Sequence, residues 1–443
     1  MKVSSASALA STMWLGNLPE KWSARRFKQI FEFVGSPRNG EIPLLSLTRK
    51  GIVERDISSN EGQLAASYEE YPVVEAGTFV LNPMDLVGGW VARTNTRGRA
   101  SGAYFSFRLR ADATEAGHSP NFFEHVLQTY YREGIFEPFG VGVGRSESGG
   151  GRWTLNRETL KHFPFPVPPP DEQRRIADFL DRETAKIDAL IAKQEQLITT
   201  LDKRRQAVIS KFVSKGSNPD APMTQDSVNV LGPAPRHWTV KRLKYSIVTS
   251  KNGVWGEEPR GDESDFWCVR IADFDRPSRS VKPFPRTVRS VTMPERFGRT
   301  LARGDLIIEK SGGGDQAPVG CVVMYDYEEP AVCSNFAARL SIANGNSSKY
   351  WTYAHAALYF HGVPWKSIKQ TSGIQNLDLS SYLNEVVAFP PLPEQLEIAE
   401  HLDEVTRDID LLVEKSVATT SVLKERRQAL ISAAVTGKLE VGV

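Results

Sequence analysis

A short cationic segment is the first candidate for chemistry in this chain. Residues 93–99 read RTNTRGR and lie between apolar stretches. Arginine and asparagine are the side chains that can bond two atoms at once on the edges of guanine and adenine. The segment therefore favours a DNA contact through Arg93, Asn95, Arg97 and Arg99, and a solvated turn explains it about equally well.

Three other segments combine cations, amides or glycines in a way that suits DNA. Residues 306–308 predict a strand, and the glycines at 312–314 beyond it would let the backbone approach a ligand closely. Residues 140–145 read GVGVGR, and residues 365–370 read WKSIKQ. A flexible loop and a surface helix end are the alternative interpretations of these last two. The further candidate DNA contacts are Arg145, Lys310, Ser311, Lys366, Lys369 and Gln370.

The motifs of common DNA enzymes are absent from the sequence. No lysine has an acidic residue two positions before it, so a (D/E)xK nuclease site cannot form. The chain also lacks the Asn/Asp-Pro-Pro-aromatic motif of amino-methyltransferases, a phosphate-binding loop and HExxH. Its seven histidines show no metal-ligand spacing. We therefore expect a non-catalytic binding protein that holds neither a metal nor a cofactor.

Composition indicates a cytoplasmic protein with more than one domain. No run approaches the ~18 apolar residues of a membrane span. The three cysteines, Cys268, Cys321 and Cys333, lack CxxC spacing and are expected as ordinary thiols in a reducing compartment. The net charge of +2 by itself does not favour nucleic acid.

The chain contains an internal duplication, which must position any binding residues. Residues 172–213 and 394–435 align without gaps at an offset of 394 − 172 = 222, and direct comparison gives 19 identities in 42 positions. Each copy follows a proline-rich entry and ends a mixed globular stretch. The order is therefore globule, long helix, globule, long helix.

Apolar residues in both copies recur at alternating steps of four and three, which predicts a coiled-coil seam. About 45 residues at a rise of 1.5 Å give a helix of about 65 Å, longer than a small domain. Chain order then requires the paired helices to be antiparallel. The expected seam and partner-binding residues are Ile176, Leu180, Ile187, Leu190 and Leu201 in the first copy and Ile398, Leu402, Ile409, Leu412 and Leu423 in the second.

The two globules also share their ends. The first opens around Trp22 with EKWSARRFK and the second around Trp238 with RHWTVKRLK, whereas their middles diverge. We expect an α+β fold: two similar mixed α/β recognition domains separated by two long antiparallel coiled-coil helices with pseudo-twofold symmetry. The expected divisions are a first domain at 1–167, a helix at 168–216, a linker at 217–235, a second domain at 236–389, and a helix with the C-terminal tail at 390–443.

The duplicated helices resemble a known family. The pattern PPxxEQxxIAxxLD occurs at 168–181 and 390–403, and RRQAxIS follows at 204–210 and 426–432. Both are similar to the helical regions of the specificity subunits of type I restriction–modification systems. Residues 304–308 and 334–336 resemble core strands of that family's target-recognition domains. The resemblance covers nearly the whole chain in the family's domain order.

This resemblance implies a function and a set of partners. Each recognition domain would read one half of an asymmetric, bipartite target in double-stranded DNA. The helices would space the domains and dock two methyltransferase subunits, which bind S-adenosylmethionine and methylate adenine. Restriction subunits, the translocase–nucleases of such systems, would join through them.

Two other classes of function compete with this one. A stand-alone DNA enzyme is opposed by the missing motifs, and a coiled-coil scaffold without DNA specificity is opposed by two divergent domains on near-identical helices. The sequence leaves open the DNA target, the spacer length, the residues that read bases and the presence of a nuclease partner, because readout depends on loop geometry and DNA shape.

Overall fold

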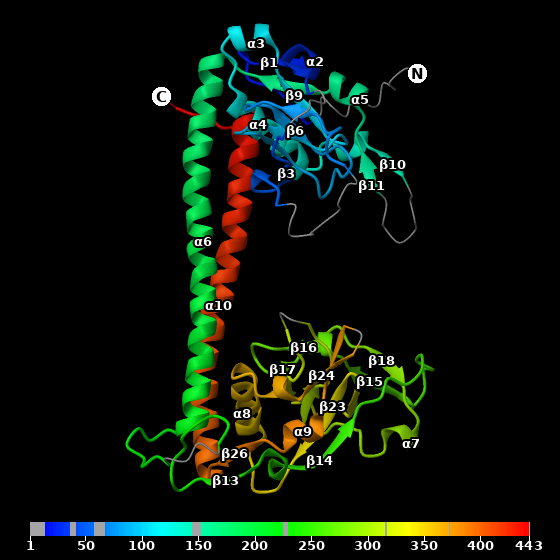
Figure 1. The fold of residues 1–443 in the computed structure, drawn as a ribbon, viewed down its shortest axis with the longest axis vertical. Coiled ribbons are helices and arrows are strands. Elements are labelled where there is room, and N and C mark those ends of the chain that lie inside the picture. The colour runs from blue at the N-terminus through cyan, green and yellow to red at the C-terminus, as the bar shows by residue number, and fades with distance from the viewer. Residues whose placement is uncertain are drawn as a thin grey trace. The chain divides into compact units, whose positions relative to one another are not determined.

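The protein consists of two compact units that share two long helices. The computed structural model describes residues 14–35, 41–56, 67–143, 152–224, 229–314, 317–371 and 373–442. Unit 1 comprises Met1–Lys193 and Thr420–Val443, and unit 2 comprises Gln194–Thr419. The helices α6 (Pro170–Lys215) and α10 (Leu392–Val435) each contribute to both units (Figure 1).

Unit 1 is built on a four-stranded antiparallel sheet in the order β2-β9-β6-β7. Residues alternate across β6, so that Phe79 and Leu81 face the main core and Val80 faces a smaller cluster. The elements are β1 (Ser23–Arg26), α2 (Phe27–Ile30), β2 (Phe31–Phe33), β3 (Leu45–Thr48), β4 (Gly51–Glu54), β5 (Val73–Val74), β6 (Phe79–Leu81), β7 (Val91–Arg93), β8 (Gly98–Arg99), β9 (Phe105–Leu109), α3 (Ala111–Glu115), α4 (Pro120–Arg132), η1 (Glu137–Phe139), β10 (Val141–Val143), β11 (Arg152–Thr154), α5 (Arg157–His162) and β12 (Pro164–Val167).

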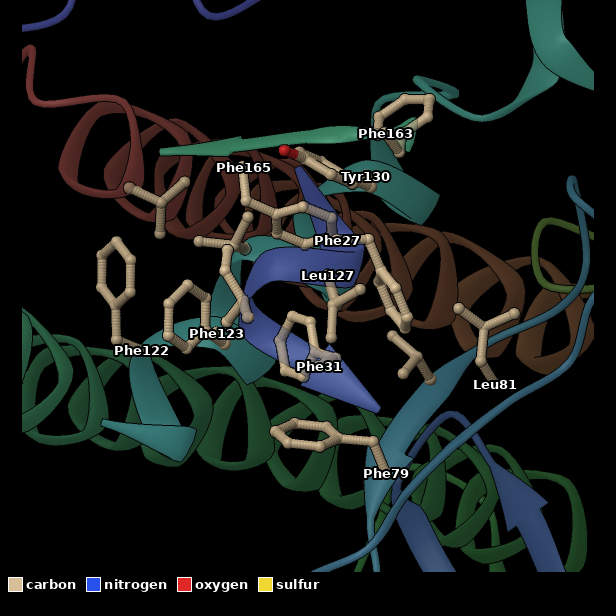
Figure 2. Close-up of a cluster of buried hydrophobic side chains, with 14 of the residues drawn as sticks. Phe27, Phe31, Phe79, Leu81, Phe122, Phe123, Leu127, Tyr130, Phe163 and Phe165 are labelled. Atoms are coloured by element: carbon tan, nitrogen blue, oxygen red, sulfur yellow. The ribbon is translucent and has the colours of Figure 1, made fainter. Parts of the chain in front are cut away.

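The main core of unit 1 is a cluster of aromatic rings between this sheet, α4 and the strand β12 (Figure 2). The ring of Phe31 lies 5.3 Å from the rings of both Phe107 and Phe123. The Tyr130 hydroxyl donates to the Pro164 carbonyl over 2.6 Å, so the one polar atom of this ring is satisfied. Burial of these large rings makes the domain a rigid support for its loops.

Unit 2 repeats this sheet and extends it. Its order is β14-β23-β19-β21-β17-β16, and the first four strands occupy the places of β2, β9, β6 and β7. The elements are β13 (Thr239–Arg242), η2 (Leu243–Ser246), β14 (Ile247–Asn252), β15 (Asp265–Val269), η3 (Ile271–Asp273), β16 (Phe274–Asp275), β17 (Ser280–Val281), β18 (Val288–Ser290), α7 (Met293–Arg296), β19 (Leu306–Glu309), β20 (Ser311–Gly312), β21 (Val322–Met324), β22 (Ala331–Cys333), β23 (Ala337–Ile342), α8 (Ser348–Phe360), η4 (Pro364–Ser367), β24 (Ile368–Thr371), β25 (Ile374–Leu377), α9 (Leu379–Leu383) and β26 (Val386–Phe389).

The central strands of the two units match residue by residue. In β19, Leu306 and Ile308 face one core and Ile307 faces another, as their counterparts do in β6. Gly77 and Gly304 precede these strands with φ of 85° and 89°, a conformation that favours glycine. The expected fold class, two related α/β domains joined by long helices, is confirmed.

The repeated Glu-Gln pair joins each domain to its helix. The Trp22 indole donates to Glu172 over 3.0 Å, and the Trp238 indole donates to Glu394 over 2.9 Å. The next residue, Gln173, accepts from the Ser119 backbone N–H over 2.9 Å and donates to the Pro168 carbonyl over 2.8 Å.

The glutamine of the second copy makes the same bonds. Gln395 accepts from the Ser347 backbone N–H over 2.9 Å and donates to the Pro390 carbonyl over 2.9 Å. Ser119 and Ser347 are the N-caps of α4 and α8, so each buried amide ties a domain helix to the start of a long helix.

The helices pair in an antiparallel manner within each unit. In unit 1, Arg427 forms an ion pair with Asp188 over 2.8 Å, and residues 176–180 share a core with residues 431–435. In unit 2, Arg205 pairs with Asp410, and residues 209–213 share a core with residues 398–402. Since 427 − 205 and 410 − 188 both equal 222, the duplication forms the same ion pair twice.

The expected seam was partly wrong in register. Leu190 and Leu412 are each 47% exposed, so neither lies in the seam. The neighbouring Ile191 and its counterpart Val413 are half-buried instead. The positions of the first helix that face inward are 184, 187, 191, 194, 198, 201 and 205. In the second helix the equivalent positions, each 222 residues later, also face inward. Adjacent apolar residues at 190–191 and 197–198 make two registers compatible with the sequence.

The other expected seam residues lie inside. Ile187, Leu201 and Ile409 are buried along the paired helices, and Leu423 is half-buried. Ile176, Leu180, Ile398 and Leu402 are buried in the cores of the globular domains. The ends of each helix therefore belong to a domain core, and its middle belongs to the pair.

The ion pair occurs twice, but we expect the same substitution to lower the stability of the protein by different amounts at the two places. The Arg205 side chain is only 5% exposed, whereas that of Arg427 is 24% exposed. Asp410→Asn should cost about 2 kcal/mol, within the range of a hydrogen bond to a charged group, because the buried guanidinium keeps one carboxylate partner, Asp202. Asp188→Asn, the matched control, should cost below about 1 kcal/mol.

Hydrogen exchange of the α10 amides measures both costs locally. Exchange near residue 410 should accelerate much more in Asp410→Asn than exchange near residue 427 does in Asp188→Asn. Equal acceleration in the two variants would show that burial does not decide the strength of this pair.

Candidate nucleic-acid interface

A three-stranded sheet in unit 2 gathers most of the expected DNA contacts of the second domain. The order is β20-β25-β24, and the register places Ser311 opposite Asn376 and Asn376 opposite Lys369. The Ser311 hydroxyl and the Asn376 amide oxygen are 2.6 Å apart. Asn376 and Lys369 are exposed, so hydroxyl, amide and ammonium groups form one row across the sheet.

Lys310 connects this row to two more elements. Its Nζ donates to the Asn252 side chain at the end of β14 over 2.6 Å. The backbone N–H groups of Lys310 and Ser311 both donate to the Phe336 carbonyl, over 2.8 and 3.0 Å, in the connection between β22 and β23. The Phe336 ring is 46% exposed, which adds an apolar surface beside the cation.

The remaining expected residues of this domain lie along β24 and before it. Gln370 is exposed on β24, opposite Gln375, and Lys366 is exposed in the turn η4 that leads into the strand. Lys369 bonds Asp378 over 2.7 Å, and this hydrogen bond lowers the pKa of the Asp378 carboxyl. The structure thus brings Ser311, Lys369 and Gln370 onto one sheet, with Lys310 directly before its first strand, from segments about sixty residues apart.

Sequence reasoning missed Asn252, Phe336 and Asn376 as members of this surface. The segment Lys251-Asn252-Gly253 has the same combination of cation, amide and glycine that singled out residues 93–99, so the same criterion would have found it. Asn376 and Phe336 carry no comparable local signal, because only strand pairing places them beside Ser311 and Lys310.

The cationic segment of unit 1 does not form one surface. Asn95 is exposed, and Arg97 is about half exposed with an ion pair to Glu75 over 3.3 Å. Arg93 is half-buried, and it bonds Glu124 and Asn121 of α4. Arg145 lies outside the described residues.

Arg99 is a correction to the expected DNA contacts. Its side chain is 4% exposed, and its guanidinium donates to the carbonyls of Glu69 and Tyr71 over 2.8 and 3.2 Å. Strand pairing of β8 with β5 turns this residue into the domain. The structure therefore gives Arg99 a structural role.

His355 and the three cysteines of unit 2 are buried away from this surface. Burial lowers the pKa of His355 to about 3, and the neutral ring bonds the Tyr382 hydroxyl over 2.7 Å. Burial also raises the pKa of the Cys268 and Cys333 thiols to about 12, and all three cysteines are free. Over the described residues there is no cluster of ligating side chains suited to a metal ion.

None of the helices in the described ranges combines the length and the apolar character that a bilayer span needs.

Comparison with known proteins gives a consistent result. The family profile described as "Type I restriction modification DNA specificity domain" matches residues 122–200, from α4 into α6. The chain is 23% identical over 326 residues to the type I restriction enzyme StySPI specificity subunit of Salmonella potsdam, covering 72% of this chain and 66% of that protein. It is also 23% identical over 295 residues to the MjaVIII specificity subunit of Methanocaldococcus jannaschii, covering 65% and 64% respectively.

The matched regions span slightly under two thirds of these two relatives. Among solved structures, a chain from a type I restriction–modification system shares the fold with a TM-score of 0.66 at 16% identity, covering 96% of this chain and all of that one. The resemblance carried by the duplicated helices is thereby confirmed: this chain is similar in sequence to the specificity subunits of type I restriction–modification systems and shares the fold of a chain from such a system.

Proposed function

We propose that the chain is the non-catalytic DNA specificity subunit of a type I restriction–modification system. Each globular domain reads one half of a bipartite, asymmetric target in double-stranded DNA. The duplication supports this most directly: the same glutamine hydrogen bonds and the same helix ion pair occur twice, whereas the exposed polar groups differ between the domains. Identical supports with different faces suit the reading of two unlike half-sites.

The helices are the proposed docking surface for two methyltransferase subunits. Leu190 in unit 1 and Leu412 in unit 2 occupy equivalent positions outside the seam, and each leaves about half of its surface exposed. Such a repeated apolar side chain suits a partner that binds twice. S-adenosylmethionine would bind to those subunits, which methylate adenine, and restriction subunits would join through them.

Mapping methylated adenines across the genome of a host that expresses the chain with its methyltransferase tests this function. We expect one motif of two short, unlike half-sites separated by a spacer of fixed length. Methylation of unrelated sequences, or of one uninterrupted short site, would contradict the proposal. The chain alone with S-adenosylmethionine should show no methylation.

The proposed spacing role predicts the effect of shortening both helices. Removal of residues 192–198 and 414–420 deletes seven equivalent residues from each helix and preserves the seam register. Seven residues at 1.5 Å shorten each helix by about 10 Å, which corresponds to about three base pairs of DNA. The recognised motif should keep both half-sites and lose about three positions from its spacer.

Selection of bound sequences from a random DNA library measures this outcome. Separate deletion of one heptad from one helix serves as the control, because it breaks the pairing and should abolish binding. A changed half-site with an unchanged spacer would contradict the spacing role.

The polar surface of unit 2, formed by Ser311, Asn376 and Lys369 with Lys310 beside them, is expected to affect the recognition of one half-site only. Lys310→Ala should cost about 1–3 kcal/mol and relax one base position if the ammonium contacts a base. If it contacts a phosphate, affinity should fall for all sequences and the salt slope should decrease by about one. Lys203→Ala, at an exposed position on α6, is the matched control.

Salt-dependent DNA affinity and a base-substitution series over the motif distinguish these outcomes. Unchanged affinity and unchanged sequence preference in Lys310→Ala would remove this surface from the interface. Relaxation in both half-sites would contradict the assignment of one domain to one half.

A further inference from the structure

The duplication provides an internal comparison of how each domain meets the long helices. α4 and α8 have the same length and corresponding N-caps, at an offset of 347 − 119 = 228. His125 therefore corresponds to Tyr353. On the long helices, Asp181 corresponds to Asp403 and Thr184 to Thr406, at the offset of 222.

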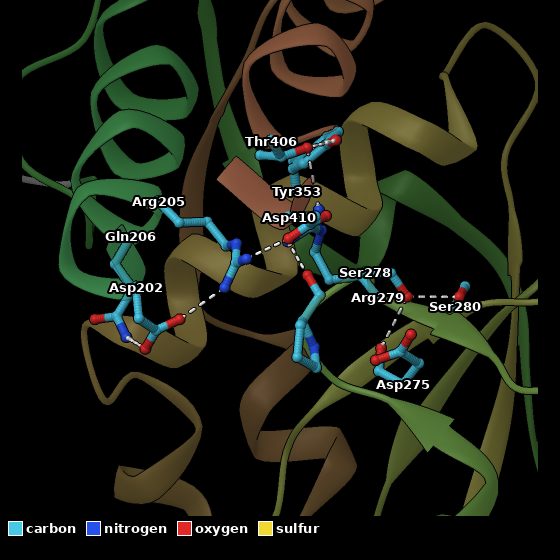
Figure 3. Close-up of polar contacts among 11 residues, drawn as sticks. Asp202, Arg205, Gln206, Asp275, Ser278, Arg279, Ser280, Tyr353, Thr406 and Asp410 are labelled. Carbon is cyan, nitrogen blue, oxygen red and sulfur yellow. Dashed lines mark hydrogen bonds and ion pairs between the residues drawn. The ribbon is translucent and has the colours of Figure 1, made fainter. Parts of the chain in front are cut away.

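In unit 2, an arginine contacts the tyrosine and the threonine of this set. Arg279 lies in the turn between β16 and β17 with φ of 58°, and it is buried. Its guanidinium stacks over the Tyr353 ring at 4.6 Å and donates to the Thr406 hydroxyl over 3.4 Å (Figure 3). The Tyr353 hydroxyl in turn donates to Asp403 over 2.7 Å.

In unit 1, the corresponding groups border an open cleft. The hairpin of β3 and β4 lies beside β7, as β17 lies beside β21, but its turn carries Lys50 and Gly51. A cleft of about 430 Å³ remains between this turn, α4 and the long helices. Its lining includes Lys50, Asn95, His125, Asp181, Thr184 and Arg427.

The cleft contains an aromatic ring and a hydroxyl at the positions equivalent to those that contact Arg279, and a carboxylate beside them. His125 Nε2 bonds Asp181 over 2.8 Å, and this hydrogen bond lowers the pKa of the Asp181 carboxyl, which is therefore anionic at neutral pH. The Asp181 side chain is 52% exposed. The Thr184 hydroxyl donates to the Leu180 carbonyl, which leaves its oxygen able to accept.

Two of the cations that line the cleft form ion pairs with neighbouring carboxylates, and Lys50 is a further cation in the lining. Arg93 bonds Glu124, and Arg427 bonds Asp188. An aromatic plane, a hydroxyl acceptor and a carboxylate together suit a guanidinium, which is planar and donates in a fork. The carboxylates Asp181 and Glu124 oppose a phosphate at this place.

We propose that this cleft is a docking slot for an arginine side chain of a protein partner. Given the proposed function, the partner is the methyltransferase subunit bound to the first half of the complex. The chain's own Arg279 occupies the corresponding slot in the second half. The two methyltransferase subunits are therefore held by unequal contacts, although the helices are duplicated.

Titration of the full chain with labelled methyltransferase subunit, read by native mass spectrometry, tests this slot. Asp181→Asn should weaken one of the two binding events by about tenfold or more and leave the other unchanged, because it removes the charge that a buried guanidinium needs. Asp403→Asn is the matched control, and it should leave both affinities within about twofold. Unchanged affinities in Asp181→Asn, or equal weakening of both events, would overturn the proposal.

A photo-crosslinking side chain at Asn95 tests the occupant without altering Asp181. Asn95 is exposed and lines the cleft, so p-benzoylphenylalanine at this position should crosslink to the methyltransferase subunit in the assembled complex on DNA. A crosslink to DNA, or one confined to the chain itself, would refute a protein partner in the cleft. Failure of any methyltransferase to bind the wild-type chain would refute the proposed function, whereas binding without dependence on Asp181 would refute only the slot.

Discussion

A buried primary amide is the interaction on which this architecture depends. Glutamine alone among the common side chains offers a donor and an acceptor of this length without charge, and Gln173 and Gln395 use both inside the protein. A glutamate at either position would lose the donor to the proline carbonyl and bring a charge into the core. The amide therefore fixes the direction in which each long helix leaves its domain. The position of every later residue of that helix relative to the domain depends on this direction.

The prolines before each amide explain why the contact forms at that place. Proline restricts the residue before it to extended conformations, so the strands β12 and β26 cannot continue directly into helix. Pro170 and Pro393 then lie in the first turn of each helix, where a missing N–H costs nothing. The carbonyls of Pro168 and Pro390 remain without helical partners, and the glutamine amides satisfy them. The prolines and the glutamine of the PPxxEQ pattern thus act together to connect a strand to a long helix, and they do so in each half of the chain.

The domain order and the helices could be predicted from the sequence, because they follow from chain connectivity and from the period of the apolar residues. The helix register and the burial of single side chains could not, because they depend on how helices pack and strands pair. The two domains, the two antiparallel helices and the absence of common catalytic motifs follow from the duplication and from composition. The seam register was ambiguous because Leu190 and Ile191 are both apolar, and only the packed structure distinguishes them. Arg99 and Arg97 look equivalent in the segment, yet pairing of β8 with β5 buries the first and leaves the second exposed.

The two halves of the chain differ at positions that do not join a domain to its helix or one helix to the other. The glutamine hydrogen bonds and the helix ion pair need fixed atoms at fixed places, so Gln173, Asp188 and Arg205 have identical counterparts. No such requirement acts on the turns beside the helices, and there Arg279 stands in one half where Lys50 and Gly51 stand in the other. After a duplication, only the residues that hold each domain on its helix must stay the same in both halves. Every surface beyond them is free to diverge, and the proposed reading of two unlike half-sites requires such divergence.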